Sequence, residues 1–126
     1  MDTSKHILIV EDDPLLRQLY ATKLADQGYQ VSVAVNGQDG FEQAQGLRPD
    51  LILLDILMPK VDGLTMLKMI RSDSNTTNIP VIIMTNTPSL PSAHECRQLG
   101  IIKALFKINI TPSQLATEIQ EYFKNQ

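Results

Sequence analysis

The stretch Asp50-Leu51-Ile52-Leu53-Leu54-Asp55 decides the fold of this chain. Its four central residues are apolar without a break, whereas a strand with one face in water alternates apolar and polar residues. The run therefore predicts a short strand that is buried on both faces, and such strands belong to parallel sheets covered by helices. Two further runs of this kind, residues 6–10 and 80–84, lie before and after it.

Helix signals separate these strands. Asp13 followed by Pro14 predicts an N-cap and the first position of a helix, and Gly28 predicts its end. The same reasoning predicts four more helices and two more strands: helices from Asn36-Gly37 to about Gly46, from Asp62, over residues 91–99 and after the capping box of Thr111 and Gln114, and strands at 30–34 and 104–106. Strand and helix thus alternate five times, which predicts an α/β fold: a five-stranded parallel sheet, doubly wound, in a three-layer sandwich. We expect a single domain over residues 1–126 and no output domain.

Composition narrows the function classes. The chain has 126 residues, of which 43% are hydrophobic and 20% charged, and its net charge is −3. Its basic residues are scattered, so we expect no nucleic-acid partner. The first apolar run is too short for a signal peptide or a membrane span, so no membrane partner is expected. The one cysteine, Cys96, has no intramolecular partner, which favours a cytoplasmic location.

Polar residues follow the predicted strands where ligands bind in parallel sheets, beyond the strands' carboxyl ends. They are Glu11, Asp12, Asp55, Thr85 and Lys107. Three converging carboxylates repel one another unless a cation lies among them, and oxygen ligands favour Mg²⁺, with Mn²⁺ as the alternative. A carboxylate such as Asp55 is a nucleophile toward phosphorus, and Thr85 and Lys107 suit phosphoryl oxygens. Lys103 is a rival to Lys107, but it lies at the start of its strand and not after it.

The segments around these residues carry a family resemblance. Residues 7–13 resemble the acidic pair of bacterial response regulator receiver domains, and residues 53–63 resemble their phosphorylation segment, D-x-x-M-P-x-x-D-G. Thr85 follows Asp55 by 30 positions and Lys107 follows Thr85 by 22, as in that family. The resemblance, closest to stand-alone chemotaxis-type regulators, implies the flavodoxin-like (βα)5 fold. It also implies a signalling protein that is no enzyme, with Asp55 as phosphoacceptor and metal ligand.

The resemblance also implies roles for the other residues. Asp12 would be a direct metal ligand, Glu11 would act through water, and the backbone carbonyl of Leu57 would be a further ligand. The donor would be a histidine kinase or a phosphotransfer protein. A downstream protein would bind the face formed by the fourth helix, fifth strand and fifth helix, and the chain would be a monomer or weak dimer.

Three residues depart from the family pattern. Ile108 stands where a proline with a cis bond is usual, so we predict a trans peptide and a reshaped loop through Asn109 and Ile110. Ala104 stands where an aromatic switch residue is usual, and Asn86 where a small residue is usual. These changes motivate an alternative, a receiver-like interaction module that is never phosphorylated. A phosphohydrolase of the haloacid dehalogenase type would need a second Asp at the position of Leu57.

Overall fold

The computed structural model describes residues 5–58, 61–86 and 91–126, apart from the side chains of 91 and 92. Five parallel strands form one sheet in the order β2-β1-β3-β4-β5. They are β1 (His6–Val10), β2 (Gln30–Ala34), β3 (Leu51–Asp55), β4 (Val81–Thr85) and β5 (Lys103–Phe106). The helices are α1 (Pro14–Asp26), α2 (Gly37–Leu47), α3 (Gly63–Ser72), α4 (Pro91–Gln98) and α5 (Pro112–Lys124), with a 3₁₀ turn at Lys107–Asn109.

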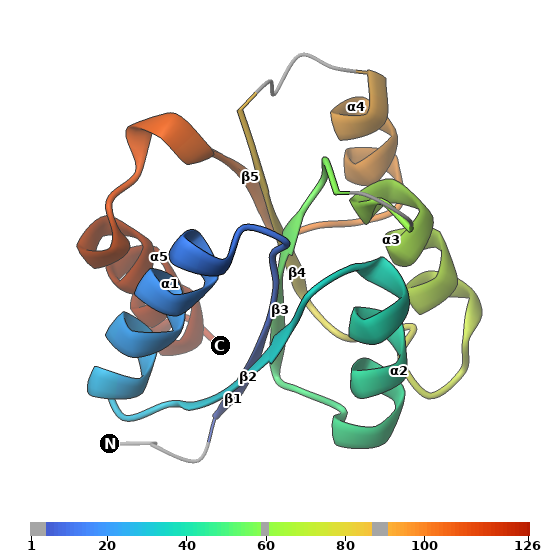
Figure 1. The fold of residues 1–126 in the computed structure, drawn as a ribbon. Coiled ribbons are helices and arrows are strands. Elements are labelled where there is room, and N and C mark those ends of the chain that lie inside the picture. Colours follow the sequence, from blue (N-terminus) through green and yellow to red (C-terminus); the bar gives the residue numbers. More distant parts are fainter. Residues whose placement is uncertain (1–4, 59–60, 87–90) are drawn as a thin grey trace.

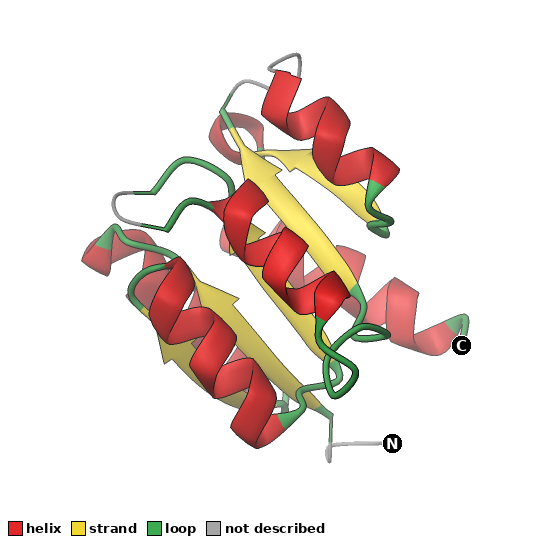
Figure 2. Cartoon of the chain, turned by 90° about the vertical axis from the view of Figure 1, so that its right-hand side faces the viewer, coloured by secondary structure: helices red, strands yellow, loops and turns green. Residues whose placement is uncertain are grey.

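The helices lie on both faces of the sheet. In Figure 1 the sheet is seen nearly edge-on, with α1 and α5 on one side and α2, α3 and α4 on the other. Figure 2 views the molecule from the side of the three helices. The doubly wound three-layer sandwich predicted from the strand runs is therefore confirmed.

The central strands are buried on both faces because their successive side chains point to opposite sides. Leu8, Ile52 and Ile83 pack beneath α2, α3 and α4. Their chain neighbours Ile9 and Leu53 pack beneath α1 and α5. The continuous apolar runs thus fill two cores, one on each face of the sheet.

The predicted helix starts are also confirmed. Asp13 caps α1 by accepting from the N–H groups of Leu15 and Leu16, and Thr111 forms the capping box of α5 with Gln114. α2 ends at Leu47, within one residue of the predicted end at about Gly46. The chain turns out of the helix at Arg48, which adopts a left-handed φ of 47°.

Two strands extend one residue beyond the apolar runs that predicted them. β4 extends to Thr85 and β5 begins at Lys103, because Thr85 pairs with Phe106 and Lys103 with Ile82 in the parallel ladder. The described residues contain no cis peptide bond, so the peptide between Lys107 and Ile108 is trans, as predicted. The 3₁₀ turn supplies the reshaped loop. Among the same residues, no helix has the length and apolarity needed to cross a membrane.

Candidate functional site

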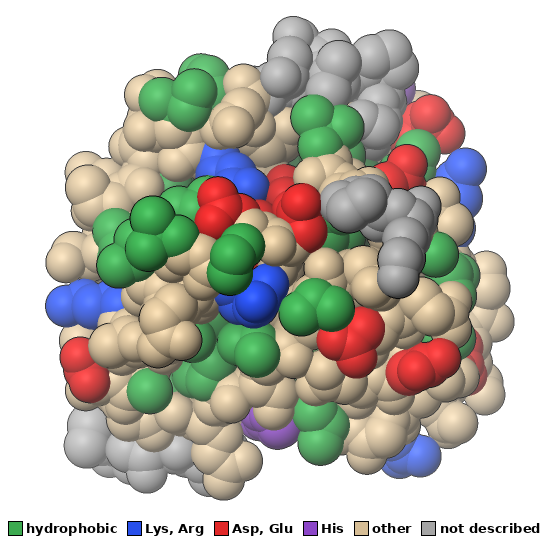
Figure 3. Space-filling model, in the orientation of Figure 1, with side chains coloured by type: hydrophobic (Ala, Val, Ile, Leu, Met, Phe, Trp, Pro, Cys, Tyr) green, Lys and Arg blue, Asp and Glu red, His purple; other side chains and the backbone are tan. Residues whose placement is uncertain are grey.

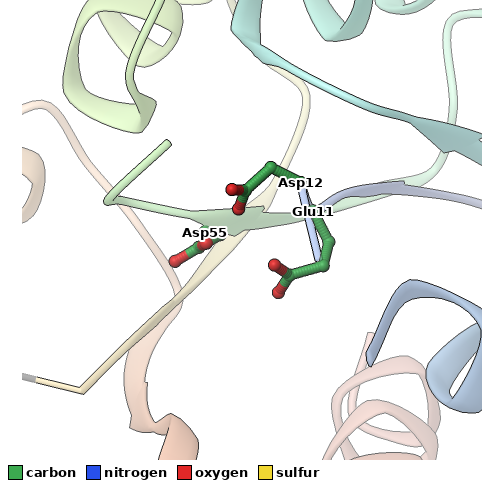
Figure 4. A group of neighbouring side chains, drawn as sticks. All are labelled: Glu11, Asp12 and Asp55. Carbon is green, nitrogen blue, oxygen red and sulfur yellow. The ribbon is translucent and has the colours of Figure 1, made fainter. Parts of the chain in front are cut away.

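The acidic pair lies directly after β1. Glu11 and Asp12 occupy the short turn between β1 and the N-cap of α1. The Glu11 N–H donates to the carbonyl of Ala34, 3.1 Å away, so the turn still follows the edge of β2. Figure 4 shows the carboxylates of Glu11 and Asp12 pointing toward that of Asp55.

Asp55 is the last residue of β3, and its side chain forms the floor of the site. It is only 5% exposed. One oxygen from each of Glu11, Asp12 and Asp55 lies within 4.8 Å of the others. Burial and the neighbouring Glu11 charge raise the pKa of Asp55 to about 7, although Lys107 lowers it. These carboxylates therefore suit a hard cation, which would relieve their repulsion.

Lys107 is the amine of the site. Its Nζ lies 2.8 Å from Glu11 Oε1 and 3.1 Å from Asp55 Oδ2. Burial disfavours the lysine's charge, but the hydrogen bond to Glu11 and the charge of Asp55 outweigh that effect, and the pKa of Lys107 is raised. The rival Lys103 instead pairs with Glu118 on the surface. The choice of Lys107 over Lys103 is therefore supported by geometry.

Thr85 reaches the same edge from β4. The strand register pairs Asp55 with Met84, so Thr85 extends one residue beyond Asp55 on the neighbouring strand. Its side chain is buried. Since Thr85 in turn pairs with Phe106, which precedes Lys107, three adjacent strands deliver an acid, a hydroxyl and an amine to one edge.

The loop after Asp55 is anchored at two points. The Gly63 N–H donates to the carbonyl of Ile56 at 2.8 Å, and the Gly37 N–H donates to the carbonyl of Val61 at 3.0 Å. A Cβ on Gly63 would lie 2.4 Å from the Asp55 carbonyl oxygen. The loop thus closes against the backbone of Asp55 in a way that only glycine allows.

Leu57 lies within this loop, two residues after Asp55, and its side chain is exposed. Its carbonyl remains a predicted ligand. Residues 59 and 60 of the loop lie outside the described residues, as do residues 87–90 after Asn86.

The three residues that depart from the family pattern differ in their surroundings. Asn86 is exposed just after β4. Ala104 is half-buried and packs against the core beneath α2, α3 and α4. Ile108 is 72% exposed in the 3₁₀ turn after Lys107.

Sequence reasoning missed Arg17. Its Nη1 donates to the Glu11 carbonyl at 2.9 Å and to the Asp12 carbonyl at 3.4 Å. A sequence signal existed, because Arg17 lies one helical turn after the N-cap Asp13, and helical side chains lean back toward the N-terminus. The signal is weak, since most arginines in a first turn face water.

The surface at this edge is mixed in character. Figure 3 shows acidic and basic side chains side by side near the centre of the face, with hydrophobic side chains around them. The exposed hydrophobic residues include Leu15 on α1, Leu57 and Ile108.

Comparison with known proteins gives one family. The response regulator receiver domain matches this chain over residues 7–120. The DNA-binding dual master transcriptional regulator RpaA of Synechocystis is 46% identical over 79 residues, which cover 63% of this chain and 33% of that protein. The regulatory protein AtoC of Escherichia coli is 35% identical over 107 residues, covering 85% and 23%. The chain therefore spans a third or less of the length of these relatives.

Solved structures agree with the fold. The chemotaxis response regulator CheY4 of Vibrio cholerae superposes with a TM-score of 0.85 at 29% identity, covering 94% of this chain and 98% of that one. The receiver domain of the sensor histidine kinase PA1611 from Pseudomonas aeruginosa gives 0.83 at 28% identity, covering 94% and 96%. That structure has a magnesium ion coordinated in its active site cleft.

Proposed function

This chain belongs to the response regulator receiver domain family, and we propose that Asp55 is the residue through which it accepts a phosphoryl group in two-component signalling. The observation that carries the proposal is the Asp55 carboxylate itself. It lies at the carboxyl end of the sheet, among two acids and 3.1 Å from the Lys107 ammonium.

Asp55, Lys107 and Thr85 have separate roles in the proposed phosphoryl transfer. An oxygen of the Asp55 carboxylate attacks phosphorus, the bond to the donor's nitrogen or acyl oxygen breaks, and an acyl phosphate forms. Negative charge then gathers on the phosphoryl oxygens. Lys107 supplies a compact cation to one of these oxygens and Thr85 a hydroxyl to another.

The three carboxylates fit Mg²⁺, or Mn²⁺ in its place. Among the described residues the Asp12 carboxylate makes no hydrogen bond or ion pair, so both its oxygens are available for direct coordination. Glu11 differs, because one oxygen accepts from Lys107 and the other from the Asp13 N–H. This supports Asp12 as a direct ligand and Glu11 acting through water. Asp55 and the Leu57 carbonyl complete the proposed set of direct ligands. When bound, the cation would offset the charge of the phosphoryl group.

The donor proposed is a histidine kinase or a phosphotransfer protein, and the readout is a population shift. Phosphorylation would draw Thr85 toward the phosphoryl oxygen, and the surface of α4, β5 and α5 would follow without an aromatic at position 104. A cytoplasmic monomer or weak dimer that is no enzyme, with one receiver unit over residues 1–126, remains our expectation.

Intact mass after incubation with acetyl phosphate and Mg²⁺ tests the acceptor. We expect the gain of one phosphoryl group, lost in Asp55→Asn and kept in Asp13→Asn, a neighbouring control that preserves the helix cap. No gain at any donor concentration would contradict the proposal and favour the interaction module.

Amide NMR tests the readout. Addition of beryllofluoride and Mg²⁺, which mimic the phosphoryl group, is expected to shift signals of α4, β5 and α5 as well as those of the site. Shifts confined to the residues around Asp55 would contradict the proposed surface.

A further inference from the structure

The turn that carries the acidic pair belongs to neither β1 nor α1. β1 ends at Val10 and α1 begins at Pro14, so Glu11 and Asp12 have no helical or strand ladder of their own to fix their carbonyls. Their carboxylates also repel each other and Asp55. A turn under such repulsion needs a fixed backbone if its carboxylates are to face one point.

Arg17 supplies hydrogen bonds on the carbonyl side of this turn. Its Nη1 lies 2.9 Å from the Glu11 oxygen and 3.4 Å from the Asp12 oxygen. The amide side is held separately, by the Asp13 N–H donating to Glu11 Oε2 at 3.1 Å. The turn is therefore fixed from both sides, and the carbonyl contacts come from one half-buried side chain.

The guanidinium of Arg17 is not paired with the carboxylates of Glu11, Asp12 or Asp55. Within the described part of the chain Arg17 makes no ion pair. It differs in this from Lys107, which occupies oxygens of Glu11 and Asp55. The guanidinium thus binds the backbone of the acidic pair and occupies none of its carboxylate oxygens.

We propose that Arg17 is a positioning residue of the cation site: it fixes the turn between β1 and α1 so that the Glu11 and Asp12 carboxylates face Asp55. The proposal depends on one part of the proposed function, namely that the site binds Mg²⁺. Arg17 itself contacts neither the ion nor the phosphoryl group.

Two substitutions distinguish a positioning role of Arg17 from a direct effect of its charge on Mg²⁺ binding. Removing a nearby positive charge in Arg17→Gln would by itself strengthen Mg²⁺ binding, because a cation repels a cation. Loss of positioning weakens binding instead. Arg17→Lys keeps the charge but loses the planar guanidinium geometry, so it weakens binding only if geometry matters.

The experiment is a Mg²⁺ titration of the metal-free chain, followed by the amide NMR signals of Glu11 and Asp12. We expect both variants to bind Mg²⁺ about tenfold more weakly, as is typical when a partner that orients metal ligands is removed. Lys23→Gln, which removes a charge near the other end of α1, is expected to bind as the wild type does. In acetyl phosphate assays the variants are expected to need more Mg²⁺ for half-maximal phosphorylation while their rate at saturating Mg²⁺ is retained.

Three results would overturn the proposal. Tighter Mg²⁺ binding by Arg17→Gln would mean that Arg17 acts only as a charge. Unchanged binding by both variants, even with a lower unfolding temperature, would mean that Arg17 serves the fold alone. A wild-type chain that binds Mg²⁺ without being phosphorylated would sink the proposed function, while weaker binding by the variants would still support Arg17. A wild-type chain that binds no Mg²⁺ would overturn both.

Discussion

The Nζ of Lys107 lies 3.1 Å from Oδ2 of Asp55, so this carboxylate has a cationic partner that does not depend on a metal ion. Lys107 does not dominate the site, however. Burial and the charge of Glu11 raise the pKa of Asp55 to about 7 in spite of it. The lysine holds the carboxylate in place while the site still lacks enough positive charge for three acids.

The pH dependence of stability follows from this raised pKa. Between the ordinary pKa of 3.8 and about 7, the folded chain keeps a proton on Asp55 that the unfolded chain has lost. Stability contributed by that proton is therefore lost as the pH rises through this window. Asp55→Asn cannot ionise, so without metal it is expected to be more stable than the wild type at about pH 8, by more than the ~1.4 kcal/mol of a one-unit shift.

Urea unfolding in the presence of a chelator measures this difference, and it is expected to shrink as the pH falls toward the ordinary pKa. Titration of the Asp55 carboxyl carbon by NMR gives the pKa directly. Equal stability of the wild type and Asp55→Asn across the whole pH range would contradict a raised pKa for Asp55.

Removal of Lys107 is expected to lower both the stability of the fold and the rate of phosphorylation. Lys107→Met leaves two carboxylates, Glu11 and Asp55, buried without their cation. Breaking a buried pair in this way costs about 3 kcal/mol. The pKa of Asp55 is expected to rise further, since Lys107 lowers it, and phosphorylation by acetyl phosphate is expected to be strongly slowed.

Lys103→Met is the matched control. It removes a lysine from β5, the strand that leads into Lys107, but one whose partner Glu118 lies at the surface, so we expect a loss of less than about 1 kcal/mol and unchanged phosphorylation. Equal losses of phosphorylation in the two variants would rule out a specific role for Lys107.

Gly63 is predicted to be irreplaceable because of its approach to Asp55. In Gly63→Ala the new Cβ would lie 2.4 Å from the Asp55 carbonyl oxygen and 2.6 Å from the Ile56 Cα. Both atoms are backbone, so the loop must move, at a cost of about 1–3 kcal/mol or more. Phosphorylation is expected to fall as well, because the displaced backbone carries the acceptor.

Gly46→Ala is the opposite case. Gly46 lies in α2, and a Cβ there meets nothing within 4 Å. Alanine is favoured over glycine within a helix, so this variant is expected to be more stable by about 0.5–1 kcal/mol. Thermal unfolding and acetyl phosphate assays of both variants check the pair. A Gly63→Ala chain as stable and as reactive as the wild type would show that the loop has room to adjust.

The fold was predictable because its signals are local. The unbroken apolar run of β3 needs burial on both faces wherever it lies, and the caps at Asp13 and Thr111 are set by neighbouring residues. Ligand sites in parallel sheets lie beyond the carboxyl ends of the strands, and this rule predicts the edge at which Asp55 and Lys107 meet.

The contacts within the site were less predictable. The sequence places Lys107 after β5 but does not say that it pairs with Glu11 as well as Asp55, because that depends on how far the flexible side chain reaches. Arg17 was missed for the same reason. The left-handed conformation of Arg48 after α2 was not predicted either, because it is more often adopted by glycine or asparagine.

The two neighbouring acids Asp12 and Asp13 are predicted to separate metal binding from folding. Asp13 caps α1, so Asp13→Ala is expected to lower stability by about 1 kcal/mol with Mg²⁺ affinity unchanged. Within the described residues the Asp12 carboxylate makes no hydrogen bond or ion pair, so Asp12→Asn is expected to leave metal-free stability equal or higher. At 100 times the dissociation constant Mg²⁺ stabilises a folded chain by about 2.7 kcal/mol, and Asp12→Asn is expected to lose most of this gain. Thermal unfolding with chelator and with Mg²⁺ measures both effects. If Asp13→Ala lost the Mg²⁺ gain while Asp12→Asn kept it, the ligand assignment between these two residues would be reversed.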